Sequence, residues 1–237
     1  MQLLELEPVR QAPANSSRHD LYGPIYKAFR AFMHDALTRL GRLDADDDVE
    51  LSGTIRQVEA LLQQLRHHVR HEKEFVHPAL EIRRPGSSAP TAEDHVHHLE
   101  QIAELEQALQ AIAAAPAPRR PALAMHAYRS LALLIAENLR HMHVEETENN
   151  VALWQLYGDA ELIEIHRRLQ RSVSPPVMRE MLGWMIGSLP TSELAEVLAG
   201  VRADAPAQEF DALVAQARHE LPPGRFQRLV QLLGLDA

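Results

Sequence analysis

The 237-residue sequence contains no cysteine. This absence excludes disulfide bonds, thiolate nucleophiles, iron–sulfur clusters and cysteine-ligated zinc, so any metal would have to bind histidine, carboxylate or phenolate side chains. Long apolar runs are also missing, and no stretch approaches the roughly 20 apolar residues of a membrane span. The first residues, Met1–Glu7, lack the basic and apolar regions of a signal peptide. From these absences we expect a cytoplasmic protein.

Positive charge is in the minority, because 24 lysines and arginines face 33 acidic residues and give a net charge of -9. The arginines are scattered, whereas a nucleic-acid-binding surface needs clustered basic residues. We therefore expect neither nucleic acid nor a membrane as a partner. The composition is otherwise that of an ordinary globular protein, and only the 14 histidines exceed normal usage. The excess of histidine is the first positive indication of function.

Helix-favouring residues dominate the chain, runs of β-branched residues are absent, and proline and glycine mark the breaks. The pattern predicts an all-α protein with long helices near residues 23–41, 51–82, 91–115 and 121–157. Because short or moderate loops join these helices, we expect an antiparallel up-down four-helix bundle. The chain then divides into an N-terminal segment, residues 1–18, the bundle, residues 19–157, and a C-terminal extension of shorter helices, residues 158–237.

Two of the long predicted helices carry the same histidine–glutamate spacing. His68 and Glu72 are four residues apart, so they lie one turn apart on one helix face, in line with the apolar Leu65. His141 and Glu145 repeat this arrangement in the last long helix. One such pair is more often a surface ion pair than a metal site. The repetition favours a metal site, because a carboxylate on an apolar face needs a partner such as a cation.

The third long helix supplies two further candidate ligands, His95 and His98, while His97 projects elsewhere. We predict His95 as a ligand. His98 remains open between a ligand and a group that hydrogen-bonds to a ligand. A cap formed by Thr91 and the acids after it is expected to begin this helix.

Imidazole and carboxylate ligands together suit iron, manganese or zinc, and carboxylates that can bridge favour two ions over one. The Glu-x-x-His spacing of ferritin-like bundles is absent from these faces, as is the His-Glu-x-x-His motif of zinc proteases. We predict two non-haem, carboxylate-bridged iron ions as the cofactor, with manganese or zinc as weaker alternatives.

The segments His67–Pro78 and His141–Glu146 resemble the two His/Glu signatures of the hemerythrin-like, or HHE cation-binding, family, and Asp94-His95 resembles its third-helix signature. The resemblance covers residues 19–157. It implies a hemerythrin-like bundle, with terminal ligands His68 and His141, bridging carboxylates Glu72 and Glu145, and His95, with or without His98, on the remaining iron.

The first long helix departs from that family. Similar sequences place a histidine there in a segment resembling Ile-His-Lys, whereas this chain has Ile25-Tyr26-Lys27. Tyr26 precedes Phe29 by about one turn and should face the interior. One hypothesis makes Tyr26 a buried tyrosine with a hydrogen-bonded hydroxyl. The other makes it a phenolate ligand whose pKa the metal lowers. His19 is a weaker substitute, since it precedes the helix.

Several other polar groups are not assigned to the site. The acidic stretch Asp44–Glu50 lacks the central glycine and distal glutamate of a calcium loop, so we interpret it as a loop with helix-capping carboxylates. Solvated surface is the preferred interpretation of a set on flanking helix faces, and hydrogen bonding to metal ligands is the alternative for some of its members. The set comprises His71, Glu74, His77, His143 and Glu146. His166 and His219 in the extension are interpreted as isolated surface or packing residues.

Three functions are compatible with this pattern. The preferred hypothesis is a non-enzymatic di-iron protein that binds or senses oxygen, peroxide or nitric oxide, or handles iron, and that has no catalytic side chains of its own. The second is a di-iron redox enzyme that consumes peroxide or nitric oxide. The third is a metal-free helical interaction module. The expected partner is a small diatomic or peroxide ligand, and a homodimer remains open.

Overall fold

The computed structural model describes residues 18–235 as helices and short connections, with no strand in that range. The all-α prediction is confirmed. Most of the predicted N-terminal segment, residues 1–17, lies outside the described residues. The long helical stretches are α1 (Gly23–Gly41), α2 (Asp48–His71) continued by η1 (Glu72–Val76) and α3 (His77–Arg83), α4 (Ala89–Ala114), and α5 (Arg120–Val144) continued by η3 (Glu145–Asn149) and α6 (Asn150–Leu156).

Local sequence explains most of these boundaries. A proline in the first turn begins α1, where its missing N–H costs no helical hydrogen bond. The Asp47 carboxylate caps α2 by accepting hydrogen bonds from the backbone N–H groups of Val49 and Glu50, as the helix-capping interpretation of the acidic loop predicts. No helix among residues 18–235 is long and apolar enough to cross a membrane.

The predicted Thr91 cap is wrong, because α4 already begins at Ala89 and Thr91 is buried inside its first turn. The preceding turn is held by the Glu81 carboxylate instead, which accepts hydrogen bonds from the backbone N–H groups of Gly86 and Ser88. Gly86 has φ of 85°, a left-handed conformation that glycine adopts without strain. A turn stabilised from the preceding helix therefore takes the place of the side-chain cap.

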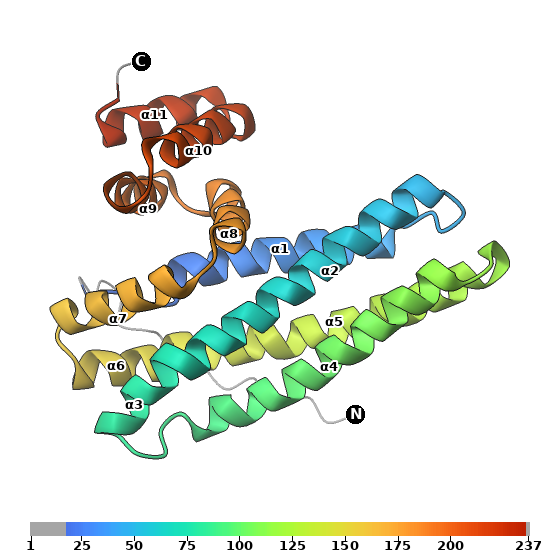
Figure 1. Cartoon of the computed structure of the whole chain (residues 1–237), viewed down its shortest axis with the longest axis horizontal. Coiled ribbons are helices and arrows are strands. Elements are labelled where there is room, and N and C mark those ends of the chain that lie inside the picture. Colours follow the sequence, from blue (N-terminus) through green and yellow to red (C-terminus); the bar gives the residue numbers. More distant parts are fainter. Residues whose placement is uncertain (1–17, 236–237) are drawn as a thin grey trace, which may run out of the picture.

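The long helices lie alongside one another, and each doubles back on the one before it (Figure 1). Helix α1 packs against α2 and α5, and α4 packs against the same two helices. The core between them is apolar at one end, and the polar residues described below are buried towards the other end, where η1 and η3 lie.

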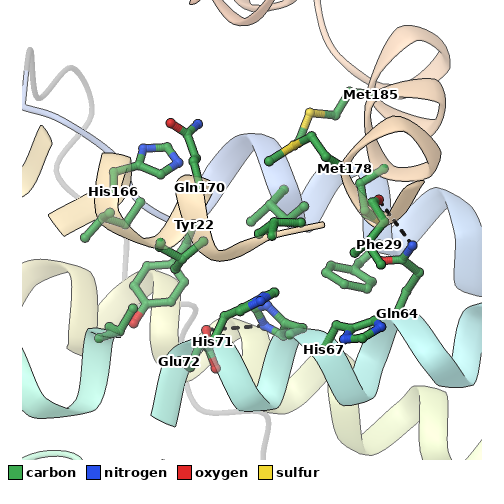
Figure 2. A pocket seen from close by; sticks show the side chains of 18 residues that line it. Tyr22, Phe29, Gln64, His67, His71, Glu72, His166, Gln170, Met178 and Met185 are labelled. Atoms are coloured by element: carbon green, nitrogen blue, oxygen red, sulfur yellow. Dashed lines mark hydrogen bonds and ion pairs between the residues drawn. The ribbon is translucent and has the colours of Figure 1, made fainter. Parts of the chain in front are cut away.

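The C-terminal extension consists of α7 (Asp159–Ser172), α8 (Pro175–Ser188), α9 (Thr191–Asp204), α10 (Ala207–Glu220) and α11 (Pro223–Leu233). Helix α8 lies on the outer face of α1, where the Trp184 ring stacks on Phe32 at a centroid distance of 4.4 Å. An ion pair of 2.7 Å between Lys27 and Glu193 adds a second link. Helices α7 and α8 also face α1 and α2 across a space lined mainly by apolar side chains (Figure 2). Helix α1 is consequently buried on two sides.

Candidate metal centre

Glu72 lies at the middle of the candidate site, at the junction between α2 and η1, and is 2% exposed. Its two carboxylate oxygens face different histidines. Oε1 is 3.2 Å from His68 Nε2 one turn earlier, and Oε2 is 3.0 Å from His95 Nε2 on α4. His68 is 13% exposed at its side chain, so it forms the edge of the site. One carboxylate thus links imidazoles from two helices.

The second predicted pair comes from α5 and η3. His141 Nε2 is 3.1 Å from the Glu145 Oε2 atom one turn later and 2.9 Å from His95 Nε2. The other ring nitrogen of His141, Nδ1, is 3.1 Å from the Asp94 carboxylate. Such a contact fixes the orientation of an imidazole and leaves Nε2 free to bind, as is usual for metal-ligating histidines.

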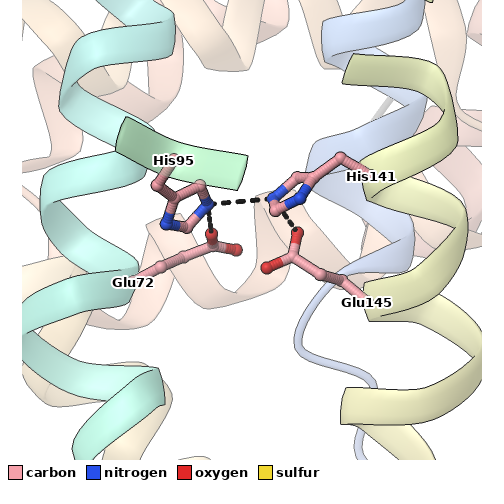
Figure 3. Close-up of side chains that lie close together, drawn as sticks. All are labelled: Glu72, His95, His141 and Glu145. Atoms are coloured by element: carbon pink, nitrogen blue, oxygen red, sulfur yellow. Dashed lines mark hydrogen bonds and ion pairs between the residues drawn. The ribbon is translucent and has the colours of Figure 1, made fainter. Parts of the chain in front are cut away.

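Together, Glu72, His95, His141 and Glu145 form one buried group (Figure 3). Each offers one nitrogen or oxygen atom, and these four atoms lie within 4.8 Å of one another. None of the four residues is more than 4% exposed. Two buried carboxylates at this distance repel each other unless protons or a cation balance their charge.

Tyr26 closes the side of the site that faces α1. The side chain is fully buried, and its hydroxyl lies 3.0 Å from Glu72 Oε1 and hydrogen-bonds to Glu145 Oε2. The hydroxyl oxygen is also 3.2 Å from His68 Nε2. Burial and the two carboxylates raise the pKa of Tyr26 well above its ordinary value. Without a metal, Tyr26 is therefore a neutral phenol that hydrogen-bonds to the carboxylates. The phenolate hypothesis depends on a bound metal and stays a prediction.

Several buried polar atoms around the site have no hydrogen-bond partner, namely Glu72 Oε2, Glu145 Oε1 and His98 Nδ1. The first of these lies close to His95 without the geometry of a hydrogen bond. Unsatisfied buried acceptors are rare and costly in proteins. A cation could satisfy the unpaired carboxylate oxygens, and imidazole with carboxylate is a donor set that iron, manganese and zinc accept.

The two carboxylates of the site differ in the direction of their pKa shifts. Burial raises the pKa of Glu145, but its hydrogen bond and charge interaction with His141 outweigh burial and lower the pKa to about 2. Burial also opposes charge on His141, yet Glu145 and Asp94 raise its pKa above the usual value. The histidines beside Glu72 are neutral, so burial and the Glu145 charge raise its pKa well above 4.5. Protons therefore balance part of the carboxylate charge, and a cation could replace them.

The neighbouring imidazoles are held neutral. Burial lowers the pKa of His68 to about 4 and that of His95 to about 2, with Glu145 only partly opposing the effect. A neutral imidazole is the form that binds a metal. His98 is also buried, and its ring centre lies 5.0 Å from that of His141. Burial lowers the pKa of His98 to about 4. His98 lies beside the four-residue group and does not belong to it.

His77 is the residue that sequence reasoning missed. The solvated-surface interpretation of His71 and His77 is wrong, since they are only 6% and 7% exposed. The His77 ring stacks on His95 at a centroid distance of 5.1 Å. Regular helical spacing would turn a residue five positions after Glu72 away from the Glu72 face. Because Glu72–Val76 forms a π-helical turn, the His77 N–H bonds to the Glu72 carbonyl and His77 returns to that face.

A π-helical turn also follows α5. Glu145–Asn149 forms a second π-helical turn, and Asn149 and Asn150 after it are buried at 5% and 2% exposure. Both candidate carboxylate ligands are thus the first residue of a π-helical turn. Such turns are rare and concentrate at functional sites.

The remaining flanking residues fall into two groups. Glu74 and His143 are exposed, as predicted. Glu146 is half-buried and forms a 2.6 Å ion pair with Arg30. His166 is not isolated, because its Nδ1 atom is 2.9 Å from Nε2 of His19, which lies outside α1 as expected.

Comparison of the chain with family models, with curated proteins and with solved structures finds no match. The chemistry of the site must therefore be argued from its geometry.

Proposed function

We propose that the chain is a hemerythrin-like four-helix bundle protein that holds two non-haem iron ions and binds or senses oxygen, peroxide or nitric oxide. The observation that carries this proposal is the buried group of Glu72, His95, His141 and Glu145, whose four donor atoms lie within 4.8 Å. Three separate stretches of helix supply these residues to one point in the interior. Two carboxylates are costly to bury in a core, and a bound cation would offset that cost.

Two ions are favoured over one by the position of Glu72. Its Oε1 atom faces His68 and its Oε2 atom faces His95, so each oxygen has a different imidazole beside it. A carboxylate in this arrangement can bridge a pair of ions, as carboxylates do in other dinuclear helical bundles. We propose His68 for one ion and His95 with His141 for the other, and Glu145 as the second bridging group. His98 and His77 are candidates for a further ligand or for hydrogen bonds to ligands.

The protein residues would orient the donors and control protons. Asp94 fixes the ring of His141 through Nδ1. The Tyr26 hydroxyl lies between Glu72 and Glu145 and holds them in position by donating its one proton to a carboxylate oxygen. When bound, iron would supply a Lewis acid that can also change its oxidation state. The Tyr26 hydroxyl is the buried proton donor closest to the carboxylates and could hydrogen-bond to a small ligand beside them.

A di-iron redox enzyme is the second candidate, and Tyr26 is the observation that favours it. A tyrosine in contact with both carboxylates is not required for ligand binding, whereas a group that holds and releases a proton serves turnover. Consumption of peroxide or nitric oxide by the iron-loaded chain, lost in Tyr26→Phe, would replace binding or sensing by this function.

The test is metal analysis of the full chain, expressed with sufficient iron, together with its optical spectrum. We expect two iron ions per chain and near-ultraviolet absorption from the iron pair. His95→Ala should lose most of the metal, whereas His97→Ala, which changes an exposed histidine two residues away on α4, should retain it. Less than half a metal ion per chain, with stability unchanged by chelation, would instead support a metal-free interaction module.

A further inference from the structure

A cavity of about 120 Å³ lies beside the candidate metal centre, between α1 and α2 on one side and α7 and α8 on the other. Figure 2 shows Met178, Met185, Gln170 and His166 of the extension on one side of this space, and His67, His71 and Glu72 on the opposite side. The volume approaches that of the roughly 150 Å³ protein cavity that takes up benzene or xenon. A molecule larger than a diatomic gas can therefore fit.

The wall formed by the extension is mainly apolar. Met178, Met181 and Met185 follow one another at helical spacing along α8, and all three line the cavity. Methionine side chains adapt to irregular apolar ligands. Among residues 18–235, no lysine or arginine lines the cavity, and Glu72 supplies the one carboxylate of its lining. An anionic ligand would find no fixed positive charge there to compensate for the loss of its hydration.

The opposite wall includes polar atoms that belong to the candidate centre. His68 and Glu72 line the cavity, and the same two residues face each other at 3.2 Å within the centre. A ligand whose apolar body lies against the methionines would therefore point its other end at these groups. The cavity connects the extension directly with the centre.

The position of α8 over this space is fixed by polar contacts. The Gln64 side-chain amide of α2 donates hydrogen bonds to the Glu180 carboxylate at 2.5 Å and to the Val177 carbonyl at 3.3 Å. The Phe32–Trp184 stack in addition holds α8 against α1. The cavity is therefore part of the folded structure and does not depend on an exposed loop.

We propose that this cavity binds small uncharged organic molecules with an apolar body about the size of benzene and one hydroxyl or hydroperoxyl head, and directs that head to His68 and Glu72. The inference deepens the proposed function by naming a ligand class for the same site. The role of the bound molecule at iron rests on that proposed function, whereas occupation of the cavity does not.

The experiment uses methionine-methyl NMR of the full chain, once after chelation and once after iron loading, with phenol as the probe. The chain has seven methionines, of which three line the cavity. Phenol should shift the signals of these three and saturate, while the exposed Met125 serves as an internal control. Benzene should bind about fivefold more weakly because it lacks the hydrogen-bonding head. Benzoate should cause no saturable shift.

Two variants test the location. Val173→Phe fills the cavity from the connection between α7 and α8 and should abolish the phenol response. Val201→Phe, the same change at a half-buried valine of α9, should not. Met178→Ala enlarges the cavity and should bind para-cresol roughly fourfold more tightly than the unaltered chain does, the gain from burying one methyl group. The second variant decides the question if Val173→Phe does not fold.

The inference is overturned if phenol leaves the three signals unchanged, if benzoate acts as phenol does, or if neither cavity variant alters binding. Phenol binding by a chain that takes up no iron would refute the proposed function and leave the cavity assignment intact. Iron uptake without a phenol response would refute the cavity assignment and leave the proposed function intact.

Discussion

Replacement of Glu72 by glutamine should change stability in opposite directions with and without metal. In the chelated chain at pH 7, Glu72 must either remain ionised beside Glu145 or take up a proton. The donor atoms of the two carboxylates are no more than 4.8 Å apart. Repulsion at that distance costs about 3.5 kcal/mol for an effective dielectric constant of about 20. Glutamine has nearly the same shape without the charge, so Glu72→Gln should stabilise the chelated chain by about 2 kcal/mol.

The effect should depend on pH with a definite sign. The pKa of Glu72 is raised above 4.5 in the folded chain, so the native state retains a proton that the unfolded chain releases. Stability is then lost as the pH rises above about 4.5, because the unfolded state binds fewer protons. The advantage of Glu72→Gln should grow over the same range. Iron-loaded protein should behave oppositely, since the variant would forfeit the roughly 4 kcal/mol that a ligand at 1,000 times its dissociation constant provides.

The assay is urea denaturation of both proteins, chelated and iron-saturated, at several pH values. Glu74→Gln provides the matched control, because Glu74 is exposed on the same helix and its replacement should stay within about 0.5 kcal/mol in both states. If Glu72→Gln destabilises the chelated chain as much as the iron-treated chain, Glu72 is a structural partner of His68 and His95 and the argument for a cation fails.

Three further changes test the neighbours of the centre. Tyr26→Phe should lower the free energy of unfolding of the chelated chain by about 2 kcal/mol, because two buried carboxylates lose a hydrogen-bond donor; an unchanged urea midpoint would contradict this. Asp94→Asn should weaken iron binding about 10- to 100-fold in a chelator competition by releasing His141 Nδ1, with the exposed Glu93→Gln as control. Burial lowers the pKa of His166 from 6.5 to about 4, so the chain should lose roughly 3 kcal/mol as the pH falls from 6.5 to 4, and His166→Gln should flatten that loss in acid denaturation curves.

The sequence predicted the helices well because their determinants are local. Proline and glycine positions, the Asp47 cap and the apolar periodicity all act within a few residues, and the predicted range 23–41 is that of α1. The spacing of His68 with Glu72 and of His141 with Glu145 likewise depends only on regular helix geometry. Three of them, Glu72, His141 and Glu145, lie together in the structure with His95, whereas His68 contacts Glu72 from outside that group. Tyr26 faces the two glutamates, as its distance from Phe29 predicts.

The features that the sequence did not predict depend on interactions that local patterns do not encode. The π-helical turn at Glu72 alters the helical phase by one residue, so His77 lies inside although its spacing from Glu72 predicts the surface. The contact between His19 and His166 joins residues 147 positions apart, and no periodicity connects them. The cavity also requires the extension to pack on α1 and α2, which the sequence does not indicate.

The double burial of α1 has a consequence for biosynthesis. Phe32 and its neighbours on α1 leave the ribosome early, but their cover, Trp184 on α8, is made much later. Until then the nascent protein exposes an aromatic surface that is prone to aggregation and can bind a chaperone. A fragment ending at Tyr157 would keep that surface exposed permanently. Folding of the extension onto α1 therefore buries this surface and removes it as a site of self-association.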